Sequence, residues 1–288
     1  MPQLRLTNSA LIVTISPRHG GGIVSFDAFG EAVLVPAPDP IRAPTDPAAF
    51  PLVPYCNRIA DGQARSGAQT IELQPNLEGE THPLHGEGWL SSWTVATNDA
   101  QTANLTVSHQ PSPGCWPWAF EATQKYELTD GELRHALSVQ NKSECAMPAG
   151  LGFHPYFLLE SGATFEAAVH GLWRTNEEKL PAAHESLPQG GPWLDGGFDQ
   201  DVELDHCFTD WERKLQIVRK NIRITLTASA ELGLLHVYAP RDATYFCAEP
   251  VSHMPDALNH LNGSFPMQML EPGETFKAEI SYLVEKSA

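Results

Sequence analysis

The feature that most constrains the fold of this chain is an alternation of apolar and polar residues that recurs from one end to the other. It is clearest at residues 4–16, 102–110, 120–143, 214–229 and 276–287. Alternation with a period of two places apolar side chains on one face of a β-strand, whereas an amphipathic helix needs a period near 3.6. The 24 prolines and 22 glycines are spread along the chain and would interrupt long helices. The pattern therefore predicts an all-β fold with few short helices.

The turn signals between these stretches indicate how the strands are connected. Asp130 and Gly131 lie between two strand-like runs, a combination typical of a tight β-hairpin. Many short strands separated by such signals favour a large antiparallel sandwich or barrel. The chain has no internal repeat, which argues against a propeller or a solenoid. We expect one large antiparallel β-sandwich domain that spans residues 1–288.

Two stretches are predicted to be irregular. Residues 36–54 are rich in proline and should form an ordered connection or an extended polyproline segment. Residues 181–201 are rich in proline and glycine and should form a loop. Neither stretch separates two halves of different composition, so neither indicates a domain boundary.

Composition excludes several classes of protein. With 35 acidic and 18 basic residues, the formal net charge is −17, the opposite of what a nucleic-acid or anionic-membrane surface requires. No apolar run approaches the roughly 18–20 residues of a membrane helix. The alternating N-terminus does not resemble a signal peptide, and the five cysteines form no CxxC pair. We expect a cytoplasmic protein with free thiols and a small-molecule partner.

Polar residues gather in four islands, at residues 54–59, 82–89, 150–157 and 248–257, with a minor fifth at 204–208. Each island alone has an ordinary explanation, such as a loop histidine, a turn or a strand-end carboxylate. Together they supply histidines and carboxylates among aromatic residues, a combination suited to general acid–base catalysis on a neutral polar molecule such as a sugar. The chain has no G-x-S-x-G elbow, P-loop or G-x-G-x-x-G motif, which argues against a serine hydrolase and against nucleotide chemistry.

A metal site is not expected from these islands. His82 and His85 are three residues apart, but Pro83 prevents them from sharing a helical face. No third ligand follows at an obvious spacing.

The islands match one family in the right order along nearly the whole chain. The matching motifs are Asn57-Arg58-Ile59, HPLHGEGW at 82–89 with Trp93, GFHPYF at 152–157, LDHCF at 204–208 and AEPVSHMPDALN at 248–259. In these motifs the chain resembles the aldose 1-epimerases, or galactose mutarotases. The match is strongest to a bacterial branch whose sugar is poorly defined.

The resemblance implies a single β-supersandwich with a cleft across one sheet, and it implies roles for individual residues. Glu249 corresponds to the general base and His154, protonated near neutrality, to the general acid. His85 corresponds to a second histidine near the ring oxygen and the anomeric centre. The implied reaction interconverts the α and β anomers of a free aldohexose by ring opening and closure, with no cofactor.

Further positions correspond to residues that bind sugar hydroxyls. Asn57, Arg58 and Asp205 belong to this group, and Tyr156 lies in the family's H-x-Y-F pattern. Two positions depart from the family. Leu158 stands where Asn is often found, and His236 stands where a Gln is common. Both departures put the sugar specificity in doubt but leave the acid and the base in place.

Two other functions remain open at this point. A phosphosugar epimerase of the same fold would need clustered Arg or Lys in the cleft, and only Arg58 lies near a motif. A non-catalytic sugar-binding protein would not demand a matched acid and base. The enzyme hypothesis predicts that five residues meet in one open cleft: Arg58, His85, His154, Asp205 and Glu249.

The cysteines Cys207 and Cys247 each lie two residues from a proposed site residue. Because alternate residues of a strand share a face, these thiols could line the floor of the cleft. The interpretation we favour is that they are small apolar fillers.

Overall fold

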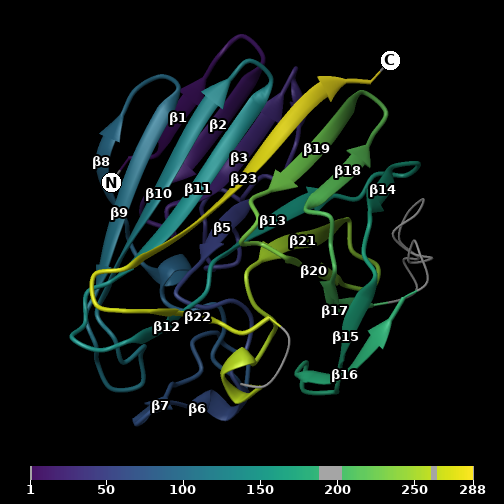
Figure 1. The fold of residues 1–288 in the computed structure, drawn as a ribbon. Helices are drawn as coiled ribbons and strands as arrows, with labels where there is room; N and C mark the ends of the chain where they lie inside the picture. The colour runs from purple at the N-terminus through teal and green to yellow at the C-terminus, as the bar shows by residue number, and fades with distance from the viewer. Residues whose placement is uncertain (1, 188–202, 261–264, 288) are drawn as a thin grey trace.

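The computed structural model describes residues 2–187, 203–260 and 265–287 (Figure 1). Strands dominate it, and the helical elements of the described residues are three short 3-10 turns: η1 (Ala60–Gly62), η2 (Gly88–Leu90) and η3 (Ala257–Asn259). The prediction of an all-β fold with few short helices is confirmed. None of the helices in these ranges is long and apolar enough to cross a membrane.

The larger sheet has eleven strands and carries the candidate site near its middle. All its strand pairs are antiparallel. Its spatial order is β1 (Leu4–Thr7), β2 (Leu11–Ser16), β3 (Gly22–Ala28), β5 (Ala49–Leu52), β13 (Gly152–Leu158), β21 (Tyr245–Val251), β20 (Leu234–Ala239), β17 (Leu204–Thr209), β15 (Gly171–Thr175) and β16 (Pro181–Ser186), with β4 (Glu31–Ala32) paired to β3.

The second sheet has eight antiparallel strands. Their order is β14 (Thr164–Ala167), β18 (Lys214–Val218), β19 (Ile222–Ala228), β23 (Thr275–Lys286), β11 (Glu132–Asn141), β10 (Phe120–Thr129), β9 (Thr102–His109) and β8 (Thr94–Asn98). Two small ribbons complete the described strands: β12 (Met147–Ala149) with β22 (Gln268–Leu270), and β6 (Gln63–Ser66) with β7 (Gln69–Glu72).

The two large sheets pack face to face and enclose the core between them (Figure 1). Tyr282 of β23 contacts Phe26 of β3 edge to face, with ring centroids 5.7 Å apart, and lies 6.4 Å from Phe157 of β13. His135 of β11 meets Phe153 of β13 in the same way at 4.7 Å. Burying each large apolar side chain contributes about 1.5–3 kcal/mol, so this interface is the main source of stability.

The alternation in the sequence corresponds to the inward and outward faces of the strands. Along β10 the even-numbered residues from Phe120 to Leu128 are buried and the odd-numbered ones are partly or fully exposed. The hairpin predicted at Asp130-Gly131 is confirmed, because Thr129 pairs with Glu132 across it. Gly131 has a φ of 77°, in the left-handed region that a tight turn requires.

The two stretches predicted to be irregular are each partly wrong. Residues 36–48 have little regular structure, but Ala49–Leu52 form β5, because this apolar run is buried between β3 and β13. Residues 181–186 form β16, because they pair with β15 at the edge of the larger sheet. Proline is tolerated there as the first residue of an edge strand. The rest of the predicted loop, residues 188–201, lies outside the described residues.

Candidate active site

A cavity of about 270 Å³ opens on the larger sheet, over strands β13, β21, β20 and β17. Every residue that the sequence singled out as catalytic or sugar-binding lines it. These residues are Asn57, Arg58, His85, His154, Tyr156, Asp205, His236 and Glu249. The prediction that the five principal residues share one cleft is therefore confirmed. Their individual roles remain predictions.

Strand register brings the distant members of this set together. His154 and Tyr156 are two apart on β13 and so point to the same face. Glu249 on β21 lies directly opposite His236 on β20. Asp205 on the next strand, β17, is paired with Tyr238 of β20. Alternate positions of four neighbouring strands thus build the floor and one wall of the cavity.

The other wall comes from loops that have left the sheet. Asn57 and Arg58 follow β5, and His85 belongs to the 82–89 island. Asn57 and His85 have φ values of 59° and 60°, so both chain segments turn sharply at the cavity. Asparagine and histidine are among the residues that tolerate this left-handed conformation best.

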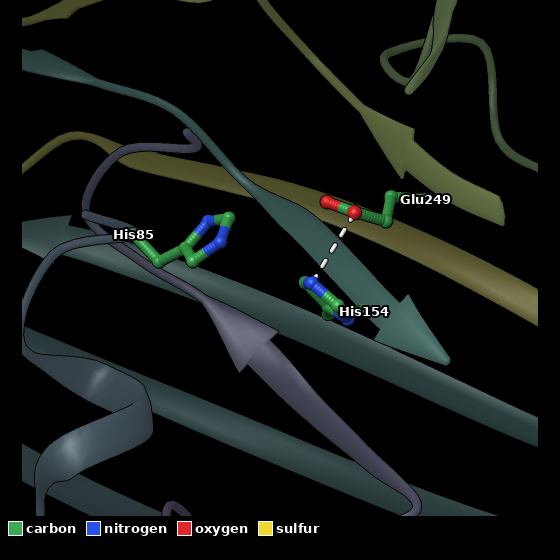
Figure 2. A group of neighbouring side chains, drawn as sticks. All are labelled: His85, His154 and Glu249. Atoms are coloured by element: carbon green, nitrogen blue, oxygen red, sulfur yellow. Dashed lines mark ion pairs between the residues drawn. The ribbon is translucent and has the colours of Figure 1, made fainter. Parts of the chain in front are cut away.

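At the bottom of the cavity, Nε2 of His154 lies 3.2 Å from Oε1 of Glu249 (Figure 2). Both side chains are buried, with 6% and 2% of their surface exposed. The distance is within the range over which a positioned acid and base exchange a proton. Oε2 of Glu249 and Nδ1 of His154 have no hydrogen-bond partner in the described structure, so both atoms are available to hydrogen-bond a ligand.

Burial controls the protonation of this pair. It raises the pKa of Glu249 to about 7, against the opposing charges of His236 and Arg58. It lowers the pKa of His154 to about 3. Burial therefore opposes the protonated form of His154 that the proposed acid role needs. Between these two pKa values the pair holds one mobile proton, which burial places on Glu249.

His85 is held as a hydrogen-bond donor. Its Nδ1 accepts the backbone N–H of Asn57 at 3.0 Å, so the proton of the neutral ring lies on Nε2. The ring stands edge-on to that of His154, with centroids 5.3 Å apart (Figure 2). Burial and the neighbouring His154, Arg58 and His236 lower the pKa of His85 well below its usual value.

His85, His154 and Glu249 also have donor atoms within 4.8 Å of one another. They are the one group of described residues arranged so that three side chains could approach a metal ion. The Nδ1 of His85 is already occupied by the backbone, which leaves this histidine a single nitrogen for any ligand.

A network of charges surrounds Asp205. Its Oδ1 lies 2.8 Å from Nε2 of His236, and its Oδ2 lies 3.9 Å from Arg58 and 4.0 Å from Lys179. Burial alone would raise the pKa of Asp205, but the hydrogen bond and charge of His236, with Arg58 and Lys179, lower it. Burial opposes the charged form of His236, but the side-chain hydrogen bonds with Asp205 and Cys207 and the charges of Glu249 and Asp205 together outweigh it and raise the pKa of His236 to about 10.

Every cation that lines the cavity already faces a carboxylate. Nε and Nη2 of Arg58 contact the two oxygens of Glu80 at 3.1 and 3.2 Å. Lys179 and His236 face Asp205. A phosphate dianion would need free cationic donors, so this arrangement favours a neutral ligand.

Nine of the lining residues were not predicted as site residues, and four of these carry a charged or phenolic side chain: Glu80, Lys179, Tyr238 and Tyr245. Tyr238 could have been found, because it lies two residues after His236 on the same strand face. Glu80 and Lys179 come from loops with no motif of their own, so only the folded chain reveals them.

Three other residues lie outside the cavity lining. Cys207 and Cys247 are fully buried and do not line it. This supports the interpretation of Cys247 as an apolar filler, whereas Cys207 has a side-chain hydrogen bond with His236 that helps to raise the pKa of that histidine. Leu158 pairs with Tyr245 across the sheet and does not line it either. His236 does, so of the two departures from the family it is the one in contact with the ligand space.

The comparisons with known proteins agree with this geometry. The aldose 1-epimerase family model matches residues 2–283. An uncharacterised protein of Escherichia coli K12, YphB, is 32% identical over 256 residues, which are 84% of this chain and 85% of that protein. The chain belongs to the aldose 1-epimerase family.

Solved structures show the same fold. A crystal structure of a candidate aldose 1-epimerase from Escherichia coli K12 superposes with a TM-score of 0.90 at 26% identity, covering 99% of both chains. A galactose mutarotase-like protein from Clostridium acetobutylicum superposes with a TM-score of 0.85 at 20% identity, covering 99% of this chain and 95% of that one. The fold is thus that of the galactose mutarotase-like proteins.

Proposed function

We propose that this protein is an aldose 1-epimerase that interconverts the α and β anomers of a free aldohexose. The observation that carries the proposal is the buried pair of Glu249 and His154, 3.2 Å apart at the bottom of a cavity. An acid and a base in contact suit proton exchange on a neutral sugar, and each cation that lines the cavity among the described residues already faces a carboxylate.

In the proposed mechanism Glu249 and His154 together remove one proton from the sugar and donate another to it. With the proton on His154, ionised Glu249 removes the proton of the C1 hydroxyl while His154 protonates the ring oxygen. The C1–O5 bond breaks and the aldehyde forms. Rotation about C1–C2 presents the other carbonyl face, and the reverse transfers close the ring. These reverse transfers leave Glu249 ionised and His154 protonated again. The 3.2 Å contact is needed earlier, when the proton passes from Glu249 to His154 before the ring opens.

The other lining residues orient the sugar in this proposal. Asn57, Arg58, Asp205 and His236 contact hydroxyl groups, and Nε2–H of His85 donates near the ring oxygen. Tyr156 presents an aromatic surface to the apolar face of the pyranose, and its ring lies 4.9 Å from that of His154. Correct orientation matters because two proton transfers must be aligned at once.

The decisive experiment follows freshly dissolved α-glucose and α-galactose by polarimetry or proton NMR, with and without the protein. The spontaneous, buffer-catalysed rate must be subtracted. Acceleration of anomerisation supports the epimerase. Saturable sugar binding without acceleration would instead identify a non-catalytic sugar-binding protein, the second candidate. Acceleration confined to a sugar phosphate would favour a phosphosugar epimerase.

Replacing Arg58 by alanine is expected to raise KM by about tenfold or more, because a charged hydrogen-bond donor to the sugar is lost. We also expect a smaller loss of kcat, since a misplaced sugar misaligns both proton transfers. Arg134→Ala is the matched control, because Arg134 is exposed and pairs with Glu132 on the other sheet. An unchanged KM in Arg58→Ala would remove Arg58 from the binding site.

The rate should fall as the pH rises through the pKa of Glu249. Below about pH 7 the buried pair holds its mobile proton, and above it the proton is lost. Exchange at C1 and O5 needs one proton on the pair, so kcat/KM should be flat from pH 5 to 6.5 and then decline tenfold per unit. A rate that instead rises through pH 7 would show that the acid is a group outside this pair.

A further inference from the structure

Residues 54–61 carry Asn57 and Arg58 into the cavity without joining either large sheet. Asn57 has a positive φ of 59°, so the chain reverses there and its amides cannot form a regular ladder. A single antiparallel bridge links Arg58 to Leu84. Buried backbone N–H groups need partners, so the stability of this loop depends on what accepts them.

Three amides of the loop donate to imidazole nitrogens rather than to carbonyl oxygens. All three histidines are buried, with at most 5% of their surface exposed. The bonds run from Cys56 N–H to His253 Nε2 at 2.9 Å, from Asn57 N–H to His85 Nδ1 at 3.0 Å and from Asp61 N–H to His82 Nδ1 at 3.0 Å. Three imidazole rings, two from residues 82–85 and one from His253, thus hold this loop by hydrogen bonds to its backbone.

An imidazole nitrogen that accepts a hydrogen bond carries no proton, which fixes the ring in one tautomer. For His253 the other nitrogen, Nδ1, faces the carbonyl oxygen of Met254 at 2.8 Å and donates to it. Burial lowers the pKa of His253 to about 4 and keeps this ring neutral. A Cβ at Gly150 would overlap the ring, so the glycine leaves the space in which His253 lies.

His253 and His82 do not line the cavity, unlike His85. A neighbouring carboxylate supports the same loop, since Oδ1 of Asp256 accepts the N–H of Ala60 at 2.9 Å. The backbone N–H of Asp256 in turn donates to the carbonyl of Arg58 at 2.8 Å. The loop is therefore held from the 248–257 island as well as from the 82–89 island.

We propose that His253 and His82 are positioning residues, which accept backbone N–H groups of loop 54–61 and so hold Asn57 and Arg58 against the sugar. This explains why both islands carry a histidine that does not reach the cavity. The effect on sugar binding rests on the proposed function, whereas the stabilisation of loop 54–61 by these hydrogen bonds does not.

The stabilisation of loop 54–61 by His253 is tested by amide hydrogen exchange in a matched pair of variants. His253→Leu removes the acceptor, and His253→Gln restores it, because Oε1 of glutamine reaches the place of Nε2. Exchange at the Cys56 amide should quicken by about tenfold or more in His253→Leu and return toward the wild-type rate in His253→Gln. Amides of the β10–β11 hairpin are the internal control. Unchanged exchange at Cys56 in His253→Leu would overturn the proposal.

His82 provides a second pair should His253→Leu fail to fold. His82 accepts through Nδ1, so His82→Asn places Oδ1 at the acceptor position and His82→Leu leaves it empty. The Asp61 amide is then the reporter, with the same expected tenfold change and the same recovery. Equal exchange rates in the Asn and Leu variants would contradict the proposal.

The effect on the sugar site is tested by combining variants. His253→Leu should raise KM, or the Kd for the sugar, by about tenfold with a smaller change in kcat. In an Arg58→Ala background the same change should have a clearly smaller effect, because one of the two groups that His253 positions, Arg58, is already gone and only Asn57 remains. Equal effects in both backgrounds would show a general loss of structure and overturn the positioning role. If the wild-type protein neither binds nor anomerises sugars, the proposed function fails. The exchange experiment still shows whether His253 and His82 stabilise loop 54–61.

Discussion

Replacing Glu249 by glutamine is expected to lower kcat by about 10²–10⁴-fold while leaving sugar affinity nearly unchanged. Glutamine keeps the length and shape of the side chain but cannot accept the proton of the C1 hydroxyl. The carboxylate acts mainly in the transition state, so its loss should appear in the rate rather than in binding. The measurement combines anomerisation rates by proton NMR, corrected for the spontaneous reaction, with a sugar-binding isotherm.

Glu87→Gln is the matched control for this experiment. Glu87 is half-buried, and its Oε1 accepts the backbone N–H of Trp116 at 2.7 Å, but it does not line the cavity. The same substitution there should leave kcat close to the wild-type value. If Glu249→Gln retains near-wild-type turnover of every good aldose substrate, Glu249 is not the base.

Much of the fold was predictable because alternation is a local property. Residues 120–143 show it: every apolar position of β10 and β11 except Ala136 points inward, because strand geometry repeats every two residues. Irregularity was harder to predict. Ala49–Leu52 became a strand because both neighbouring strands bury it, a tertiary effect that a proline-rich composition conceals.

The candidate site was predictable in its residues and not in its electrostatics. Resemblance to the family identified His154 and Glu249, since short motifs survive in order along the chain. Their protonation depends on burial of both groups, which no motif encodes: burial raises the pKa of Glu249 and lowers the pKa of His154. Partners such as Glu80 and Lys179 come from loops, where side-chain position depends on the whole fold.

The role of the second half of the pair can be tested by His154→Gln, which should lower kcat about as much as Glu249→Gln does. The two groups share one mobile proton, so removing either stops the same exchange. The double variant should therefore be scarcely slower than either single variant, whereas independent contributions would multiply. His135→Gln is the control, because His135 is equally buried but lies in the core against Tyr126.

Each outcome of this cycle has a distinct meaning. His135→Gln should lower the unfolding temperature and leave the kcat of the folded protein unchanged. A double variant slower than both single variants by the product of their effects would show that Glu249 and His154 act in separate steps. The shared-proton mechanism would then be wrong, and the 3.2 Å contact between them would be structural rather than catalytic.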